Sequence, residues 1–299
     1  MGFLESKVVI VTGAGSGFGR IVATMLAAGG AKVVGADIDE GAVAAVANEI
    51  RAAGGIAEHI AADVASHEQM LAVAAFAVEH FGRIDVLVNN AGIMPLAFFS
   101  DHARAWQAWD TAIDVNVKGV VHGISAVYDQ MIAQGAGHVV NVSSIYGNAG
   151  VAGAAVYSAT KAAVAAISDA LRVEAKGKIK VTTIKPTGVP GTNLASAIVN
   201  TAAVVGLTGG YAQEFIDRAV SARQDGWPAE TTDPRRHPLL GDHTRTDGRR
   251  DRLHDRPTMG NQHQRHHRAR QRRSLRVLRR AGTRPRLSLF FKTPVLLEA

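Results

Sequence analysis

Short runs of consecutive apolar residues alternate with longer alanine-rich stretches from Lys7 to about Val220, and this alternation constrains the fold more than any other feature. The runs are continuously apolar, which is typical of parallel strands covered on both faces. They predict strands at Lys7–Val11, Lys32–Ala36, Ile56–Ala61, Ile84–Val88, His138–Val142 and Lys178–Ile184. The intervening stretches predict helices at Gly17–Ala28, Glu40–Ala53, Glu68–Phe81, Ala112–Ala133 and Tyr157–Ala175. These successive units indicate an α/β fold with a doubly wound parallel sheet, which binds ligands at the carboxyl ends of its strands.

The composition changes after Thr231. Residues 1–234 contain 15 Lys and Arg against 21 Asp and Glu, whereas residues 235–299 contain 18 against 5. Between Gly241 and Arg273 the only clearly apolar residues are Leu253, Met259 and Ala269, too few to offset the entropy lost on ordering. We therefore expect one folded domain over residues 1–230 and a basic, disordered or aberrant tail over residues 231–299. The abrupt change to Arg-, His- and Pro-rich sequence also leads to the hypothesis that the reading frame shifts near Thr231.

Composition excludes several broad classes of protein. The chain has no cysteine, which excludes a disulfide framework and thiolate metal sites. The histidines with metal-like spacing (His263, His266 and His267) lie in the biased tail, and we expect no metal site. No run approaches the ~18 consecutive apolar residues of a membrane span, and the N-terminus lacks the pattern of a secretory signal. We expect a cytoplasmic protein without membrane contact.

A glycine-rich turn connects the first expected strand to the first expected helix. It reads Thr12-Gly13-Ala14-Gly15-Ser16-Gly17-Phe18-Gly19. Its glycines allow a tight turn and let the backbone approach a pyrophosphate at the positive end of the helix. Such a turn alone is a weak signal. Here Asp37 closes the second expected strand 20 residues beyond Gly17, where a carboxylate can accept hydrogen bonds from ribose hydroxyls.

The spacing of Gly13, Gly17 and Gly19 resembles the glycine motif of short-chain dehydrogenases/reductases, whose sheet is of the Rossmann type. Asp63-Val64 and Asn89-Asn90-Ala91-Gly92 extend the resemblance in the expected order. Taken alone, Asp63 is equally well a helix N-terminal residue, and Asn-Asn-Ala-Gly a turn after a strand. The resemblance implies cofactor contacts from Thr12, Gly13, Ser16, Gly17, Phe18, Gly19, Asp37, Ile38, Asp63, Val64, Asn90, Ala91, Gly92, Tyr157, Lys161, Pro186, Val189 and Thr192.

The same residues bear on the choice of cofactor. The Asp37 carboxylate would repel the 2′-phosphate of NADP. Ser16 stands where NADP-preferring relatives often carry a basic residue. Arg20 is nearby but is expected to point into solvent. We therefore predict NAD as the cofactor.

Tyr157 and Lys161, in Tyr157-Ser158-Ala159-Thr160-Lys161, are spaced i and i+4 and thus share one face of a helix. A tyrosine acting as general acid/base needs a pKa well below its ordinary value near 10. A nearby ammonium together with a positive nicotinamide ring can lower the pKa. An isolated Tyr-x-x-x-Lys is more simply explained as helix-surface pairing, and only the surrounding motifs favour catalysis.

Two further residues complete the catalytic set that the resemblance implies. Ser144 ends the fifth expected strand, where its hydroxyl can orient a substrate oxygen toward Tyr157. The neighbouring Ser143 is a competitor for this role, and either serine can be a turn or cap residue. The family pattern favours Ser144. It also assigns Asn116 to a water-mediated proton relay toward Lys161, although without the resemblance Asn116 is an ordinary polar helix residue.

Two departures from the family pattern lie after the sixth expected strand. The family's Pro-Gly and following threonine appear as Lys185-Pro186-Thr187-Gly188, with the glycine and Thr192 each one residue late. No sequence after Glu230 resembles the seventh strand and final helix that the family normally adds.

The sequence thus predicts an NAD-dependent oxidoreductase for a secondary alcohol or ketone. The apolar segments Pro95–Phe99, Tyr146–Gly153 and Leu194–Ala222 favour an apolar substrate. The resemblance implies a homodimer through the two long helices. A rival hypothesis is a non-catalytic cofactor-fold protein whose basic tail binds nucleic acid. The tail has no aromatic residue among its arginines before Phe290, which disfavours base stacking.

Overall fold

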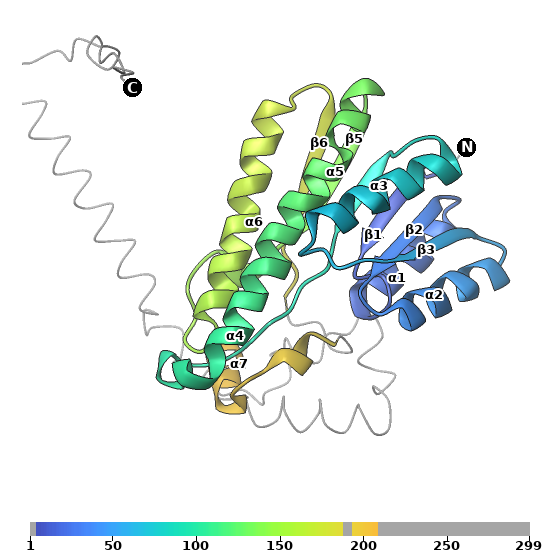
Figure 1. Ribbon diagram of the computed structural model, residues 1–299. Coiled ribbons are helices and arrows are strands. Elements are labelled where there is room, and N and C mark those ends of the chain that lie inside the picture. The colour runs from blue at the N-terminus through green and yellow to red at the C-terminus, as the bar shows by residue number, and fades with distance from the viewer. Residues whose placement is uncertain (1–3, 188–192, 209–299) are drawn as a thin grey trace, which may run out of the picture. The chain divides into compact units, whose positions relative to one another are not determined.

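A computed structural model describes residues 4–187 and 193–208, which form a parallel six-stranded sheet with helices on both faces (Figure 1). The strands, in the spatial order β3-β2-β1-β4-β5-β6, are β1 Val8–Thr12, β2 Lys32–Asp37, β3 Ile56–Ala61, β4 Val86–Asn89, β5 Gly137–Val142 and β6 Ile179–Ile184. The order reverses between β1 and β4, which is where doubly wound sheets bind ligands. The predicted fold class is confirmed.

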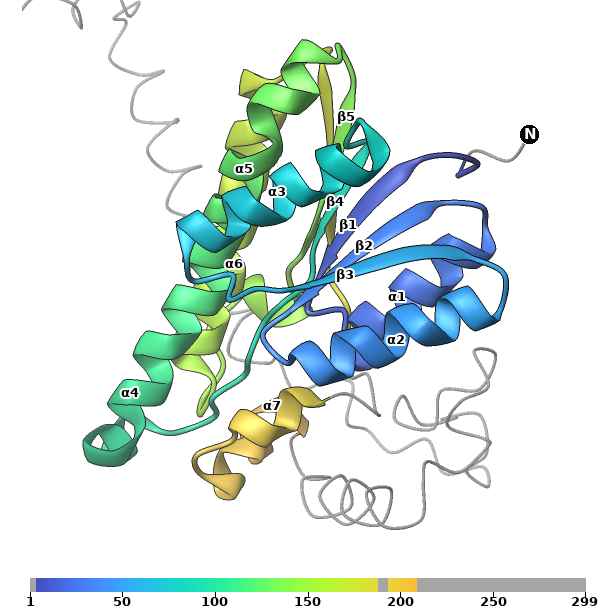
Figure 2. The ribbon, with the colours of Figure 1, turned by 45° about the vertical axis from the view of Figure 1, so that its right-hand side comes forward.

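Helices cover the sheet in two groups. They are α1 Gly17–Ala28, α2 Glu40–Ala52, α3 His67–Phe81, α4 His102–Ile113, α5 Gly119–Ala133, α6 Ala155–Glu174 and the short α7 Val205–Thr208. Helices α1 and α2 lie on one side of the sheet and α3, α5 and α6 on the other (Figure 2). Each side has its own hydrophobic core, one around Val33 and Ile50 and the other around Ile10 and Leu87. The continuous apolar strands predicted from sequence therefore face a core on both sides.

The helix starts follow from local hydrogen bonding. Asp39 precedes α2 and its carboxylate accepts the Ala42 N–H at 2.9 Å. Ser66 does the same for α3 with the Gln69 N–H at 3.3 Å. Each side chain satisfies a backbone donor that the first helical turn leaves unpaired. These caps fix where α2 and α3 begin after β2 and β3.

The predicted helix Ala112–Ala133 is helical throughout, but the prediction placed its start too late and missed a change of helix type. The chain is helical ten residues earlier, in α4, and a π-helical turn, Asp114–Lys118, joins α4 to α5. The π-turn inserts an extra residue into the helical repeat, so the apolar faces of α4 and α5 are out of phase. The buried residues of α4 are only Ala105 and Ala112, so its buried face is made of small side chains.

A cluster of charged side chains lies at the amino ends of the strands. Asp85 is only 6% exposed and accepts hydrogen bonds from Lys7 at 3.0 Å and from Arg83 at 2.7 and 2.8 Å. It also accepts the Val8 N–H at 3.0 Å. Burial alone would raise the pKa of Asp85, but these four donors hold its pKa below the usual value. The cluster fastens the start of β4 to the start of β1.

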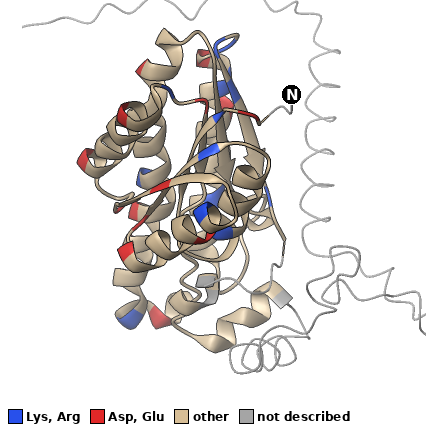
Figure 3. Cartoon of the chain, turned by 90° about the vertical axis from the view of Figure 1, so that its right-hand side faces the viewer, with Lys and Arg blue, Asp and Glu red and all other residues tan. Residues whose placement is uncertain are grey.

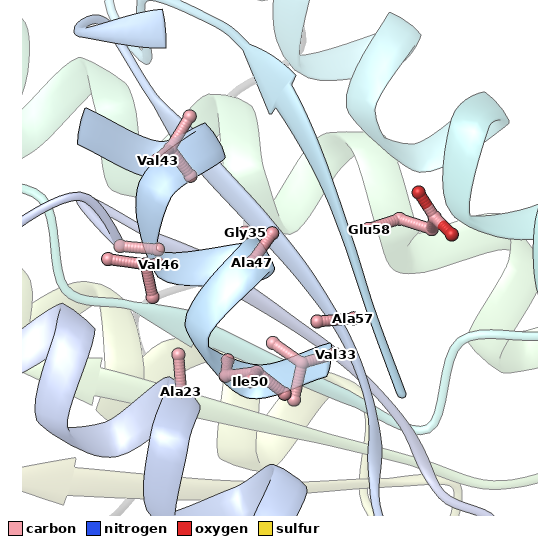
Figure 4. Close-up of a pocket in the computed structure, with 10 residues that line it drawn as sticks. Ala23, Val33, Gly35, Val43, Val46, Ala47, Ile50, Ala57 and Glu58 are labelled. Atoms are coloured by element: carbon pink, nitrogen blue, oxygen red, sulfur yellow. The ribbon is translucent and has the colours of Figure 1, made fainter. Parts of the chain in front are cut away.

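A small apolar hollow lies between α2 and the strands β2 and β3 (Figure 4). Its lining is almost entirely aliphatic, and Glu58 directs its carboxylate away from the other lining residues. The carboxylate lies 3.6 Å from Arg51 instead. The hollow is therefore a packing gap within the core.

The predicted domain boundary and basic tail concern residues other than those that form the sheet and its helices. Lys, Arg, Asp and Glu are interspersed over the described part (Figure 3). The predicted boundary at residue 230 and the basic tail 231–299 lie outside it. Within residues 4–187 and 193–208, β6 is an edge strand, and no helix has the length and hydrophobicity needed to cross a membrane.

Candidate active site

The sequence motifs meet at the carboxyl edge of the sheet. The glycine-rich turn follows β1, Asp37 is the last residue of β2, Asn90 follows β4, and Ser144 lies two residues beyond β5. Parallel pairing brings these four strand ends to the same edge. Residues from four separate parts of the sequence thus face one region.

The glycine-rich turn packs against the end of β4 without room for side chains. A Cβ on Gly19 would collide with the Gly13 carbonyl oxygen and would lie 2.6 Å from the Asn90 amide nitrogen. The Asn90 side chain donates to the Thr12 and Gly13 carbonyls at 2.9 and 3.2 Å, and the Thr12 hydroxyl accepts the Asn90 and Ala91 N–H groups. These bonds hold the turn open at the start of α1.

Asp37 is oriented by backbone donors. One carboxylate oxygen accepts the Gly15 N–H at 2.8 Å and the other accepts the Asp39 N–H at 3.1 Å. Ile38, beside it, is 73% exposed. Arg20 bonds both oxygens of Glu49 at 2.8 and 3.1 Å, so its charge is directed to α2. Gly15 was not singled out from the sequence, although it stands in the middle of the quoted glycine turn.

Asp63 and Val64 lie between β3 and α3. The Asp63 carboxylate accepts the Ala65 N–H at 2.9 Å, while the helix cap itself is Ser66. Val64 is buried, and its carbonyl is 3.0 Å from the Nδ1 atom of His122 on α5. Asp63 is thus a turn residue ahead of the helix rather than its cap.

Tyr157 and the two candidate serines have distinct surroundings. Tyr157 is buried on the first turn of α6. Burial raises its pKa, the hydrogen bond with Ser144 lowers it, and the neighbouring Tyr146 raises it further. The Ser143 hydroxyl instead donates to the Lys161 carbonyl at 2.7 Å. Of the two serines, Ser144 is therefore the one that contacts the Tyr157 hydroxyl.

Lys161 is a buried ammonium group, only 4% exposed, on the same face of α6 as Tyr157. Its Nζ donates to the carbonyl of Val142 at 2.9 Å and lies 5.9 Å from the centroid of the Tyr157 ring. Burial lowers the pKa of Lys161 to about 8. Such a displaced pKa beside a strand end is a feature of functional sites.

Asn116 occupies the middle of the π-helical turn and is completely buried. Its side chain accepts the Ile93 N–H and donates to the Ile93 carbonyl, both at 2.9 Å. It also donates to the Thr160 hydroxyl at 3.1 Å, which in turn donates to the Tyr157 carbonyl at 2.7 Å. Thr160 was not predicted, although it lies within the quoted tyrosine motif. The structure brings together all four predicted catalytic residues.

The sequence model of the short chain dehydrogenase family matches residues 7–203 of this chain. The chain belongs to the short-chain dehydrogenase/reductase family. It is 37% identical over 223 residues to an uncharacterized oxidoreductase of Listeria monocytogenes, covering 73% of this chain and 89% of that protein.

Two solved structures of short-chain oxidoreductases are similar to it. The enzyme from Burkholderia phymatum, in complex with NAD, has a TM-score of 0.63 and 36% identity over 66% of this chain and 70% of its own. A metagenomic enzyme in complex with NADP has a TM-score of 0.59 and 34% identity over 65% of this chain and 88% of its own. This chain is therefore an oxidoreductase of the short-chain family.

The geometry fits the dinucleotide that short-chain dehydrogenases use. Gly19 and Gly13 pack too closely for a side chain, as the tight turn around a pyrophosphate requires, and Ser16 at the start of α1 makes no side-chain cap to its helix. Pro186 is half-buried and its carbonyl accepts the Ile145 N–H at 3.2 Å. Val189 and Thr192, the other predicted contacts near it, lie outside the described residues. Among residues 4–187 and 193–208, no group of three or more His, Asp or Glu is arranged to hold a metal ion.

An apolar cluster adjoins the loops of this short-chain dehydrogenase site. It joins all three segments predicted to select the substrate, because Leu96 of the first and Ala203 and Val204 of the third are buried with Ala154, and Val151 of the second packs against them. Met94, Phe98, Val151, Ile198 and Leu207 pack around them.

Proposed function

We propose that this chain transfers a hydride between NAD(H) and an apolar secondary alcohol or ketone, with Tyr157 as the general acid/base. The observation that carries the proposal is the buried Lys161, whose pKa is lowered to about 8 and which lies on the same helix face as Tyr157. Burying an ammonium group against the Val142 carbonyl at 2.9 Å is costly, and such costly charges are frequent at functional sites.

The proposed roles follow from the contacts of each residue. Tyr157 takes the alcohol proton in oxidation and returns it in ketone reduction. Ser144, which contacts the Tyr157 hydroxyl, holds the substrate oxygen against it. The bound nicotinamide ring supplies the hydride acceptor or donor. Lys161 stabilises the Tyr157 phenolate against the burial that raises its pKa, and Asn116 completes the proton relay.

The proposed preference for NAD rests on two charged groups. Asp37 places a carboxylate at the end of β2, already oriented by the Gly15 and Asp39 amides. Arg20, the basic residue in the first turn of α1, is neutralised by Glu49. A 2′-phosphate would therefore meet a negative charge without a compensating cation from Arg20.

The proposed assembly is a cytoplasmic homodimer formed through the long helices. Support comes from exposed apolar side chains at Ile113, Val121 and Val173, which are 43%, 45% and 75% accessible. A chain without cysteine is in keeping with that compartment. Sedimentation of the full chain should give twice the monomer mass, and a monomer at micromolar concentration would contradict this assembly.

Substitution of the tyrosine tests the reaction. Tyr157→Phe should lower kcat by at least about 10³-fold, because it removes the proton-transferring hydroxyl. The fluorescence enhancement of bound NADH should remain nearly unchanged. Tyr128→Phe, on α5, is the matched control and should retain activity. Turnover of secondary alcohols by Tyr157→Phe at the wild-type rate would refute the assignment.

A further inference from the structure

Tyr146 is a second tyrosine beside Tyr157 that the proposed chemistry does not use. It lies two residues after Ser144, in the short 3-10 turn Ile145–Gly147, and its N–H donates to the Ser144 hydroxyl at 3.2 Å. Its own hydroxyl donates to the Leu207 carbonyl at 3.1 Å, across 61 residues of sequence. Burial raises the pKa of Tyr146, which keeps the phenol protonated and able to donate.

The turn that carries Tyr146 is fixed to the body of the domain. The Ile145 N–H donates to the Pro186 carbonyl at 3.2 Å, just beyond β6. The Lys185 ammonium donates to the Asn148 side chain at 2.6 Å. These contacts hold both sides of the turn against the end of β6, so Tyr146 projects from a rigid base.

The segment that Tyr146 reaches is residues 193–208. Its middle is attached to the loop after β4, because the Val199 and Asn200 N–H groups both donate to the Leu96 carbonyl. The Asn200 side chain also donates to Asp101 at 2.8 Å. The end of the segment lies against the loop before α6, where a Cβ on Gly206 would collide with the Ala152 carbonyl oxygen. The hydrogen bond from Tyr146 to Leu207 thus holds the end of the segment, as the bonds to Leu96 and Asp101 hold its middle.

We propose that Tyr146 is a positioning residue that latches residues 193–208 to the loop carrying Ser144, and that this latch sets the affinity of the site for its substrate. Ala203 and Val204 of the segment are buried in the apolar cluster with Leu96 and Ala154. In the proposed function the segments that meet in this cluster line the substrate site, so loosening the Leu207 end would weaken the apolar contacts that hold the substrate. The effect on substrate rests on the proposed function, whereas the latch itself does not.

Tyr146→Phe tests the latch in the full chain, because it removes only the hydroxyl. Hydrogen exchange measured by mass spectrometry should be about three- to tenfold faster in peptides from residues 193–208, as expected for the loss of one net hydrogen bond. Exchange in β5, Gly137–Val142, should not change. Tyr128→Phe is the matched control and should alter neither region. Unchanged exchange in residues 193–208 of Tyr146→Phe would overturn the latch.

Steady-state kinetics on secondary alcohols then test its role in the reaction. In Tyr146→Phe we expect KM for the alcohol to rise at least about fivefold, with kcat within about twofold and NADH affinity unchanged. A fall in kcat at unchanged KM would overturn the positioning role, because it would place Tyr146 in the chemical step. If the wild-type chain turns over no alcohol or ketone, the proposed function fails, while the exchange comparison still decides whether the latch exists.

Discussion

Two buried charged side chains, Asp85 and Lys161, lie at opposite ends of the parallel sheet. Asp85, at the amino ends, is bonded by Lys7, Arg83 and the Val8 amide. Lys161, at the carboxyl ends, has the carbonyl of Val142 as its hydrogen-bond partner. The pKa of each group responds accordingly, since that of Asp85 is held below its usual value and that of Lys161 falls to about 8.

The difference distinguishes a charged residue that stabilises the fold from one that we propose serves the reaction. The partners of Asp85 stabilise its charged form in the folded state, so the charge contributes to the free energy of unfolding. Burial of Lys161 destabilises its charged form, so the folded protein tolerates an ammonium that costs stability. Asp85 and Lys161 thus differ in the sign with which the fold acts on their charged forms.

The largest expected effect comes from Lys161→Met. Activity should fall by about 10²- to 10⁴-fold, because the phenolate of Tyr157 loses its stabilising charge. The free energy of unfolding at pH 7 should rise by about 1–2 kcal/mol. The lowered pKa corresponds to a cost of about 3 kcal/mol for the buried charge, against about 1 kcal/mol for the lost hydrogen bond. Urea unfolding and initial rates measure the two quantities.

The exposed residue Lys176, at the end of α6, offers a matched control for that variant. Lys176→Met should leave both activity and stability within experimental error. The pKa of Lys161 is lower folded than unfolded, so its cost is full below pH 8 and declines toward pH 10.5. The stability advantage of Lys161→Met should shrink over that range, and a destabilised, active Lys161→Met would reverse the comparison.

Asp85→Asn should do the opposite of Lys161→Met, because it should lower stability and leave activity unchanged. We expect a loss of about 2 kcal/mol in the free energy of unfolding at pH 7, with kcat unchanged for the folded protein. The folded pKa of Asp85 is depressed, so its contribution is complete above pH 4 and is lost as the pH falls through that lower pKa. The gap between wild type and variant should therefore narrow toward pH 2. Asp129→Asn, at an exposed position, controls for the loss of one charge.

The smallest effect concerns Asp37, a carboxylate at the functional end of the sheet. The wild-type chain should prefer NAD over NADP by at least about tenfold in kcat/KM, or about 1.4 kcal/mol. Asp37→Ser should abolish this preference by removing the repulsion of the 2′-phosphate. Asp39→Asn removes a charge two residues away while retaining the cap of α2, and should keep the preference. Equal use of both cofactors by the wild-type chain would show that another group neutralises Asp37.

Much of the fold was predictable because strand and helix periods are local properties. The bounds of α1 and β3 were predicted without error, and those of the other strands within two residues. The exception was α4, where only alanines are buried and the π-turn breaks the helical repeat. A period that changes phase within one helical region is not visible as a single amphipathic face.

In the candidate site, too, contacts between residues close in sequence were predictable and contacts between distant residues were not. The i, i+4 spacing of Tyr157 and Lys161 is local, so the sequence alone predicted that they share a face. The bonds from Tyr146 to Leu207 and from Asn116 to Thr160 join residues 61 and 44 positions apart. Such pairings depend on the packing of complete elements, and no residue type at either end signals its partner. Tyr146 consequently appeared in the sequence only as one boundary of a loop.

The π-helical turn Asp114–Lys118 affects how a one-residue gap in an alignment of related sequences should be interpreted. It accommodates one residue more than an α-helical turn, so losing a single codon here would restore a regular helix from α4 into α5. The chain would keep its reading frame and a longer continuous helix. The residues before the deletion would rotate by about 100° relative to α5, which would take Asn116 away from Ile93 and Thr160. A one-residue gap at this point in an alignment should therefore be counted as a loss of the site rather than as neutral variation in length.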